Sequence, residues 1–222
     1  MNREKRILNP SNKVFKSYGL KISELDHNIR SITREYELNF EEVSNIFQEL
    51  IDTVVYDEKM AAIGFLTRFK KLFNDSIVIL YKKALSNHCN TWAFCDSSMI
   101  KIIGPYLAKK QKSNLAKSTI KEWSCSSELW VKRASLVIFL KRVMIKKDFD
   151  EKLFYNLTER LIDDDEDYIK KALGWMIKTC SKNKPNFIFQ YLMENRDKFD
   201  RSTLRTSCEK LNDDLKQDVL NS

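Results

Sequence analysis

The chain has 222 residues, enough for one sizeable domain with a hydrophobic core, and its formal net charge is +8. Charged residues make up 32% and hydrophobic residues 43% of it, a balance that suits a solvated helical protein. With 4 Gly and 3 Pro, it has too little turn chemistry for an all-β fold, a Rossmann fold or a phosphate-loop enzyme.

The predicted elements are helices that follow a polar start. Residues 1–21 contain breaks at Asn9-Pro10-Ser11-Asn12 and Tyr18-Gly19, so we expect this segment to be less ordered. Beyond it, apolar residues recur at intervals of three and four, which is helical spacing, and Asn39 is suited to cap the second helix. No stretch is convincing as a strand. The predicted helices span 22–38, 40–51, 57–69, 74–85, 89–103, 114–123, 127–144, 150–162, 165–180, 186–193 and 202–211, followed by a short tail.

A repeat appears in the second helix of each predicted pair. A small residue recurs there at intervals of 36, 36, 38 and 35. This period is close to that of HEAT and armadillo units, in which small residues let neighbouring helices approach closely. The sequence therefore predicts an all-α fold: one domain over residues 1–222, built as a curved α-solenoid of HEAT-like helix pairs with a concave face for an extended ligand. The aligned small residues are Ala62, Ser98, Ala134, Ala172 and Ser207.

The same alignment gathers residues with functional chemistry. Equivalent positions in a solenoid line up along one surface. Asp96, Lys132 or Arg133, and Lys170 or Lys171 are therefore predicted to form a row across adjacent repeats. Trp92 precedes Asp96 by one helical turn, and Trp175 follows Lys171 by one turn. The positions three after each small residue are Phe65, Lys101, Val137, Trp175 and Lys210.

Positive charge is concentrated in the middle of the chain. Residues 59–147 hold 18 Lys and Arg against 4 Asp and Glu, whereas the remainder holds 21 basic and 27 acidic residues. Such a distribution is the footprint of a polyanionic partner such as nucleic acid. A lysine-rich surface that only keeps the protein soluble remains the alternative on charge alone.

The five cysteines, at 89, 95, 125, 180 and 208, do not suggest a disulfide framework. Their number is odd and no C-x-x-C is present, so we expect neither disulfides nor a zinc site. His88-Cys89 with Cys95 could form part of a metal site, but the chain has only 2 His, and we interpret the cysteines as small core residues. Trp123 and Trp130 are also interpreted as core.

Several motifs resemble the DNA alkylation repair enzymes of the AlkD type, a HEAT-like family of DNA glycosylases. The resemblance covers roughly the whole chain, and the motif ending at Trp175 is the most specific. The matching stretches are Trp92-x-x-x-Asp96, Trp130-Val131-Lys132-Arg133-Ala134, Asp165-Glu166-Asp167-Tyr168-Ile169-Lys170-Lys171-Ala172-Leu173-Gly174-Trp175 and, more faintly, Tyr18-Gly19-Leu20-Lys21 and Ser202-Thr203-Leu204-Arg205.

The resemblance implies hydrolysis of the N-glycosidic bond of cationic 3- or 7-alkylated purines in duplex DNA, the first step of base excision repair. Asp96 would stabilise the oxocarbenium-like sugar and orient or deprotonate the attacking water. Trp92 and Trp175 would pack against the deoxyribose. The resemblance implies no metal or organic cofactor and no deep pocket for a flipped base. DNA-backbone contacts are expected from Arg133, Lys132, Lys171, Lys178 and Arg205.

Two other functions remain open at this point. One is a non-catalytic DNA-binding or scaffold HEAT-repeat protein, against which Asp96 argues. The other is a protein-binding scaffold that takes an acidic peptide. Because no apolar run reaches membrane-spanning length and the N-terminus lacks a signal-peptide core, we expect a cytoplasmic, nucleoid-associated monomer that binds no membrane.

Overall fold

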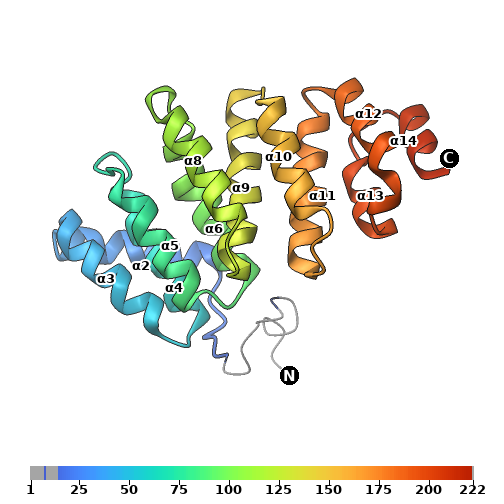
Figure 1. Ribbon diagram of the computed structural model, residues 1–222. Helices are drawn as coiled ribbons and strands as arrows, with labels where there is room; N and C mark the ends of the chain where they lie inside the picture. The colour runs from blue at the N-terminus through green and yellow to red at the C-terminus, as the bar shows by residue number, and fades with distance from the viewer. Residues whose placement is uncertain (1–7, 9–14, 222) are drawn as a thin grey trace. The chain divides into compact units, whose positions relative to one another are not determined.

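The structure is a computed structural model that describes residue 8 and residues 15–221, so the break expected at Asn9–Asn12 lies outside the described residues. The chain divides into two compact units, Met1–Tyr106 and Leu107–Ser222. The predicted all-α solenoid of HEAT-like helix pairs is confirmed, since each unit is built from paired helices (Figure 1). No helix in the described part of the chain has the length and apolarity needed to cross a membrane.

The first unit pairs α3 with α4, and α5 with the segment that begins at α6. Helix α2 lies across α4, and α4 also packs against α6. The segment after α5 is an α-helix, one π-helical turn and a further short helix in succession. The elements are α2 (Ile22–Glu35), α3 (Phe40–Asp52), α4 (Tyr56–Arg68), α5 (Ser76–His88), α6 (Trp92–Ser98), the π-helix η1 (Met99–Ile103) and α7 (Gly104–Leu107).

The segment before α2 is held against the start of α4. Lys16 forms a single parallel β-bridge with Val55. The carboxylate of Asp57, 3% exposed, accepts hydrogen bonds from the backbone N–H groups of Tyr18 (2.7 Å) and Leu20 (3.1 Å). Asp57 therefore sets the point from which α2 begins.

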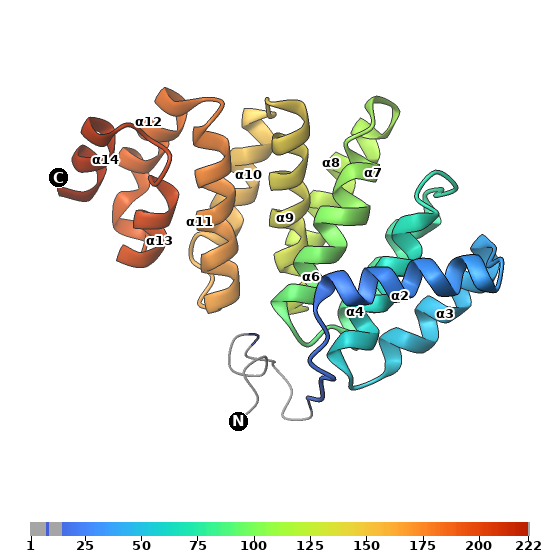
Figure 2. The same ribbon diagram turned by 180° about the vertical axis from the view of Figure 1, so that it is seen from behind.

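The second unit is a stack of helix pairs with two layers. Helices α9, α11 and α13 lie side by side in one layer (Figure 2), and α8 packs against α10 in the other. The elements are the 3₁₀-helix η2 (Lys110–Lys112), α8 (Ser113–Ser124), α9 (Leu129–Lys146), α10 (Glu151–Leu161), α11 (Asp167–Ser181), α12 (Pro185–Asn195), the 3₁₀-helix η3 (Arg196–Lys198), α13 (Arg201–Ser207) and α14 (Asp213–Asn221).

The repeat positions lie where the packing argument requires them. All five small residues are at most 1% exposed. In the second unit, Ala134, Ala172 and Ser207 lie on α9, α11 and α13, the three helices that pack side by side. The cap predicted at Asn39 is also confirmed, because its side chain accepts from the backbone N–H groups of Glu41 and Glu42.

The end of the chain differs from its predicted bounds. The expected tail is the helix α14, where the Asn212 side chain accepts from the N–H of Leu215 at 2.9 Å and so supplies a cap. The helix expected over 202–211 ends at Ser207 instead. Short polar stretches such as Asn212-Asp213-Asp214 combine a cap with few apolar residues, and periodicity alone does not detect them.

The helix predicted over 89–103 is the largest departure. It begins at Trp92, because the Thr91 side chain accepts from the N–H of Phe94 at 3.3 Å and caps the helix there. From Met99 the backbone widens into a π-helical turn, in which the N–H of Gly104 bonds to the carbonyl of Met99. Pro105 explains the widening: it has no N–H for the carbonyl four residues back, and its ring would clash there.

Candidate functional site

Trp92 and Asp96 share helix α6 and lie one turn apart. Asp96 is 8% exposed, so its carboxylate lies in a largely water-excluded position. Trp92 is half-buried, and the helix residues between them are buried. Because Thr91 fixes the first turn of α6, the orientation of both side chains is set by the loop between α5 and α6.

That loop is held by a buried lysine. Lys59, on α4 and 6% exposed, donates from Nζ to the carbonyl oxygen of His88 at the end of α5. Burial lowers the pKa of Lys59, and the nearby Cys89 and Asp52 partly oppose this. Burial likewise raises the pKa of the Cys89 thiol, with a further rise from Asp96 and an opposing effect from Lys59. The ammonium of Lys59 and the carboxylate of Asp96 thus both act electrostatically on the sulfur of Cys89.

In the second unit, Arg133 joins neighbouring helices. It is 5% exposed on α9, and its guanidinium donates from Nη1 to the backbone carbonyl of Tyr168 on α11. The Tyr168 ring packs against Trp130 with centroids 5.0 Å apart. Arg133, expected to clamp a phosphate, therefore also holds the start of α11 against α9.

Two of the expected DNA-contacting lysines have carboxylate partners. Lys132 Nζ lies 2.6 Å from Asp164 Oδ2, with the two side chains 20% and 12% exposed. Lys178 Nζ lies 2.5 Å from Glu209 Oε2, and the hydrogen bond from Lys178 lowers the pKa of Glu209. These pairs connect α9 to the loop before α11, and α11 to the end of α13.

The remaining predicted residues of the second unit reach solvent. Lys171 is exposed, with Nζ 3.6 Å from Asp167 Oδ2 and 5.9 Å from the centroid of the Tyr168 ring. Arg205 on α13 is exposed, and Trp175 on α11 is half-buried. Lys171 and Arg205 thus present cationic groups to solvent on adjacent helices of one layer.

The prediction of core residues is confirmed for both tryptophans and for three of the five cysteines. Trp123 and Trp130 are buried, at 1% and 5% exposed, as are the cysteines at 95, 180 and 208. Cys89 is partly exposed by surface area, and its sulfur lies 3.4 Å from the Thr91 carbonyl. The interpretation of Cys125 as a core residue is wrong: it is exposed at the end of α8, where Arg160 contacts its sulfur.

Sequence reasoning missed Lys59 and the role of Tyr168. Lys59 lies three residues before the small residue Ala62, so a lysine at that point on a buried helix face was the available signal. Tyr168 lay within a recognised motif, but its contribution is a backbone carbonyl that accepts from Arg133, 35 residues away, and a ring contact with Trp130, which spacing along the chain does not reveal.

Comparison of the chain with known proteins gives one family match. A family model described as DNA alkylation repair enzyme matches residues 3–211. None of the curated proteins compared with the chain matches it.

Solved structures match over most of their length. A protein from Enterococcus faecalis, described as a predicted DNA alkylation repair enzyme, is 17% identical with a TM-score of 0.78, covering 90% of this chain and 90% of that chain. AlkD2 from Streptococcus mutans is 18% identical with a TM-score of 0.62, covering 87% of this chain and 91% of that one. At these identities the likeness concerns the fold.

Proposed function

The chain belongs to the DNA alkylation repair enzyme family, and on that premise we propose that it is a DNA glycosylase for cationic alkylated purines in duplex DNA. The observation that carries the proposal is Asp96: a carboxylate 8% exposed on α6, one turn after the half-buried Trp92, within the motif by which the sequence resembles AlkD-type glycosylases.

The reaction suits a single carboxylate. A 3- or 7-alkylated purine already carries positive charge, so it leaves as a neutral base when it takes the electron pair of the C1′–N bond. Positive charge then develops on the sugar, and a carboxylate in a water-poor position stabilises it. Water adds to C1′ and loses its proton, for which Asp96 is the base. No step requires a metal or an organic cofactor.

The other residues have supporting roles in the proposal. In the first unit, the Trp92 ring packs against the deoxyribose, and in the second unit the Trp175 ring makes the same kind of contact with the DNA. Lys171 and Arg205 bind backbone phosphates directly, since both are exposed.

The other three cationic side chains are already engaged within the protein. Two of them must release a carboxylate to bind phosphate, and the third positions a helix. Lys132 and Lys178 reach phosphate by exchanging Asp164 and Glu209 for a phosphate oxygen. Arg133, which is 5% exposed and donates to the carbonyl of Tyr168, orients α11 and so supports the phosphate contacts indirectly.

The direct test is chromatographic identification of bases released from methylated duplex DNA. Wild type should release 3- and 7-methylpurines, and Asp96→Asn should slow release by about 10²- to 10⁴-fold, because it removes the charge and the base while keeping the shape. Glu49→Gln, at an exposed carboxylate on α3, is the matched control and should release bases at the wild-type rate.

The same experiment addresses the non-catalytic alternative. A wild-type protein that binds methylated duplex but releases no base is a DNA-binding module, and the glycosylase proposal is then wrong. Equal release by wild type and Asp96→Asn would remove Asp96 from the chemistry.

A further inference from the structure

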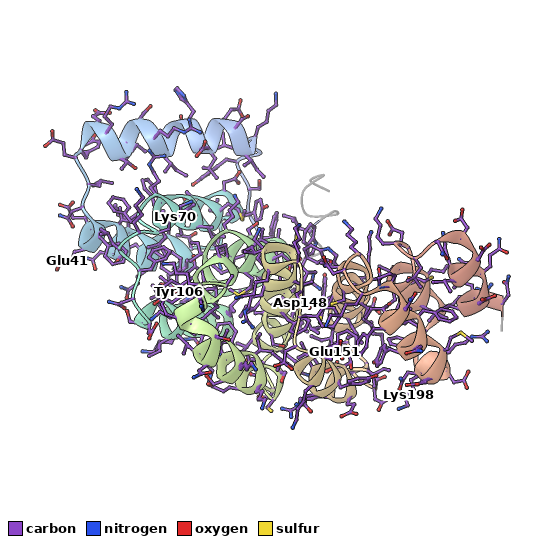
Figure 3. All side chains as sticks on the ribbon, turned by 90° about the horizontal axis from the view of Figure 1, so that it is seen from above. Glu41, Lys70, Tyr106, Asp148, Glu151 and Lys198 are labelled. Carbon is purple, nitrogen blue, oxygen red and sulfur yellow. The ribbon has the colours of Figure 1, made fainter. Side chains whose placement is uncertain are left out.

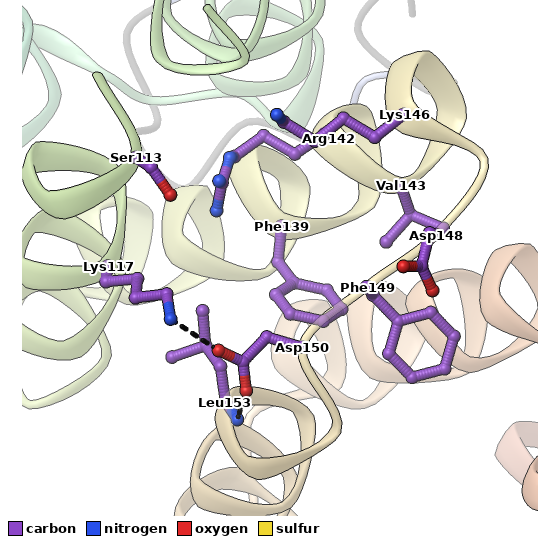
Figure 4. Close-up of a pocket in the computed structure, with 10 residues that line it drawn as sticks. All are labelled: Ser113, Lys117, Phe139, Arg142, Val143, Lys146, Asp148, Phe149, Asp150 and Leu153. Carbon is purple, nitrogen blue, oxygen red and sulfur yellow. Dashed lines mark hydrogen bonds and ion pairs between the residues drawn. The ribbon is translucent and has the colours of Figure 1, made fainter. Parts of the chain in front are cut away.

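A cavity of about 560 Å³ lies in the second unit, where the end of α9 meets the starts of α8 and α10 (Figure 4). Its volume is within the range of small-ligand sites. It has a charged side and an apolar side. The lining residues are Ser113, Lys117, Phe139, Arg142, Val143, Lys146, Asp148, Phe149, Asp150 and Leu153.

The acidic groups of the cavity are neutralised by lysines. Asp150 Oδ2 lies 2.6 Å from Lys117 Nζ, and its other oxygen accepts from the N–H of Leu153. Asp148 lies 3.2 Å from Lys184 Nζ, which also reaches Glu151 at 2.7 Å. Figure 3 labels Asp148, on the turn between α9 and α10, and Glu151, the first residue of α10. The cations that remain on the lining are Arg142 and Lys146.

Arg142 is incompletely satisfied. Its Nε is buried and has no hydrogen-bond partner among the described residues. Burial lowers the pKa of Arg142, and the carboxylate of Asp150 partly offsets this. A buried donor without an acceptor costs free energy. Arg142 as a whole is half-buried, so the rest of its guanidinium can meet an anion in the cavity. Figure 4 shows the Arg142 guanidinium directed across the cavity toward Ser113.

Ser113, the first residue of α8, also lines the cavity and can offer its hydroxyl group to an anion. Its backbone N–H already donates to the carbonyl of Lys110, because the preceding 3₁₀-helix runs directly into α8. The 3₁₀-helix that precedes it has Lys110 and Lys112. The Ser113 hydroxyl and the Arg142 guanidinium therefore face the same space from different walls of the cavity.

The side of the cavity away from these polar groups is apolar. Phe139 and Phe149 lie edge to face with ring centroids 6.0 Å apart, and Val143 and Leu153 complete the wall. Such a wall suits a flat or weakly polar group attached to the anion, rather than a free inorganic ion.

The cavity is separate from the surface expected to bind duplex DNA. Arg142 follows Arg133 by nine residues on the continuous helix α9. At about 100° and 1.5 Å per residue, nine residues place the two arginines on opposite faces, roughly 13 Å apart along the axis.

We propose that this cavity binds the phosphate monoester of a single nucleotide. The phosphate lies between Arg142, Lys146 and the start of α8, and the nucleoside lies against Phe149, Val143 and Leu153. The source is either a free mononucleotide or the 5′-phosphorylated end of a DNA strand, and both present the same group. The inference does not depend on glycosylase activity.

Titration calorimetry of the full chain with deoxyadenosine monophosphate tests the site. Wild type should bind it, and bind deoxyadenosine at least tenfold more weakly. Arg142→Gln should weaken nucleotide binding at least tenfold. Lys147→Asn, the control, removes a neighbouring cation outside the lining at a left-handed position that Asn tolerates, and should bind as wild type does.

A second variant tests the site independently, in case Arg142→Gln does not fold. Ser113→Glu places a carboxylate in the cavity at a helix start that favours acidic residues, so it should fold and still lose nucleotide binding at least tenfold. Wild-type affinity in Ser113→Glu, or no binding of deoxyadenosine monophosphate by wild type at millimolar concentration, would overturn the proposal. If inorganic phosphate bound as tightly as the nucleotide, the proposed contact between the nucleoside and the apolar wall would be wrong.

Competition distinguishes the two sources. A 5′-phosphorylated oligonucleotide that displaces labelled deoxyadenosine monophosphate, when its 5′-hydroxyl counterpart does not, identifies the strand end as ligand. Displacement by free mononucleotides alone identifies the free nucleotide. Displacement by both oligonucleotides equally would mean that the nucleotide binds the duplex surface, and the proposal fails.

Discussion

At the residue scale, the basic side chains differ more in the groups they contact than in their positions within the repeat. Lys132 and Lys171 each lie within two residues of an aligned small residue, yet the ammonium of Lys132 is held by Asp164 and that of Lys171 is exposed. The spacing of Trp92 and Asp96 could be predicted because it is local. The partner of Lys132 could not, because it lies 32 residues away.

Asp150 is a residue whose contribution to the free energy of unfolding should depend on pH. It caps α10 through the N–H of Leu153, and the hydrogen bond from Lys117, followed by that N–H, lowers its pKa below 3.8. The pair with Lys117 is exposed and adds little, so the cap dominates. Asp150→Ala should lower the free energy of unfolding by about 1 kcal/mol near neutral pH.

The sign of the pH effect follows from the lowered pKa. The stabilisation is present above the unfolded-state pKa and is lost as pH falls through the folded-state value. Urea denaturation should therefore show wild type and Asp150→Ala converging in acid. Asp150→Asn keeps an uncharged cap and serves as the control: its stability should lie between those of wild type and Asp150→Ala at neutral pH and should depend less on pH than that of wild type. A difference of the same size at neutral and acidic pH would contradict this account.

At the element scale, close helix approach depends on residues without bulk. The repeat positions were readable because Ala and Ser recur at a fixed period. Gly174 on α11 makes a closer approach: a Cβ there would lie 3.3 Å from the carbonyl oxygen of Thr203 and from Cβ of Thr206, both on α13. Helix α13 thus packs on a surface of α11 that has no room for a branched side chain at position 174.

Gly174→Val should destabilise the second unit by about 1–3 kcal/mol, because two methyl groups would push against the backbone of α13. Gly174→Ala should cost less, since its helix propensity offsets part of the crowding. Chemical denaturation of both variants measures the difference. A Val variant as stable as wild type would mean that α13 is not held at this distance.

At the scale of the whole molecule, periodicity predicted the fold class, and chain order predicted the pairing of helices. Division into two compact units was not readable, because the break at residues 106 and 107 lies within the short helix α7 and carries no linker composition. The concentration of 18 basic residues in the middle of the chain indicated a polyanion, but not which of them remain exposed after folding.

Binding of duplex DNA should depend steeply on salt, because each phosphate contact releases counterions. Replacing Lys171 and Arg205 by Gln should reduce the slope of log affinity against log salt by about 2. The double variant Lys121→Gln, Lys152→Gln removes the same charge from exposed positions on α8 and α10, in the other layer, and should keep the slope. Equal slopes for both double variants would exclude Lys171 and Arg205 from the phosphate contacts.

The wide turn at Met99–Ile103 has a consequence for how the repeats correspond. A turn that holds an additional residue rotates everything after it by roughly 100° relative to an uninterrupted helix. Residues after Ile103 are therefore out of phase with the corresponding residues of the other repeats, and Lys101, which lies inside the turn, is shifted only part of the way despite having the same spacing as Trp175. Lys101 instead borders a separate hollow of about 460 Å³ beside Ile22, Met60 and Gly64. Deleting one residue from this turn should rotate the residues that follow it back by roughly 100°, and so bring them into phase with the corresponding residues of the other repeats.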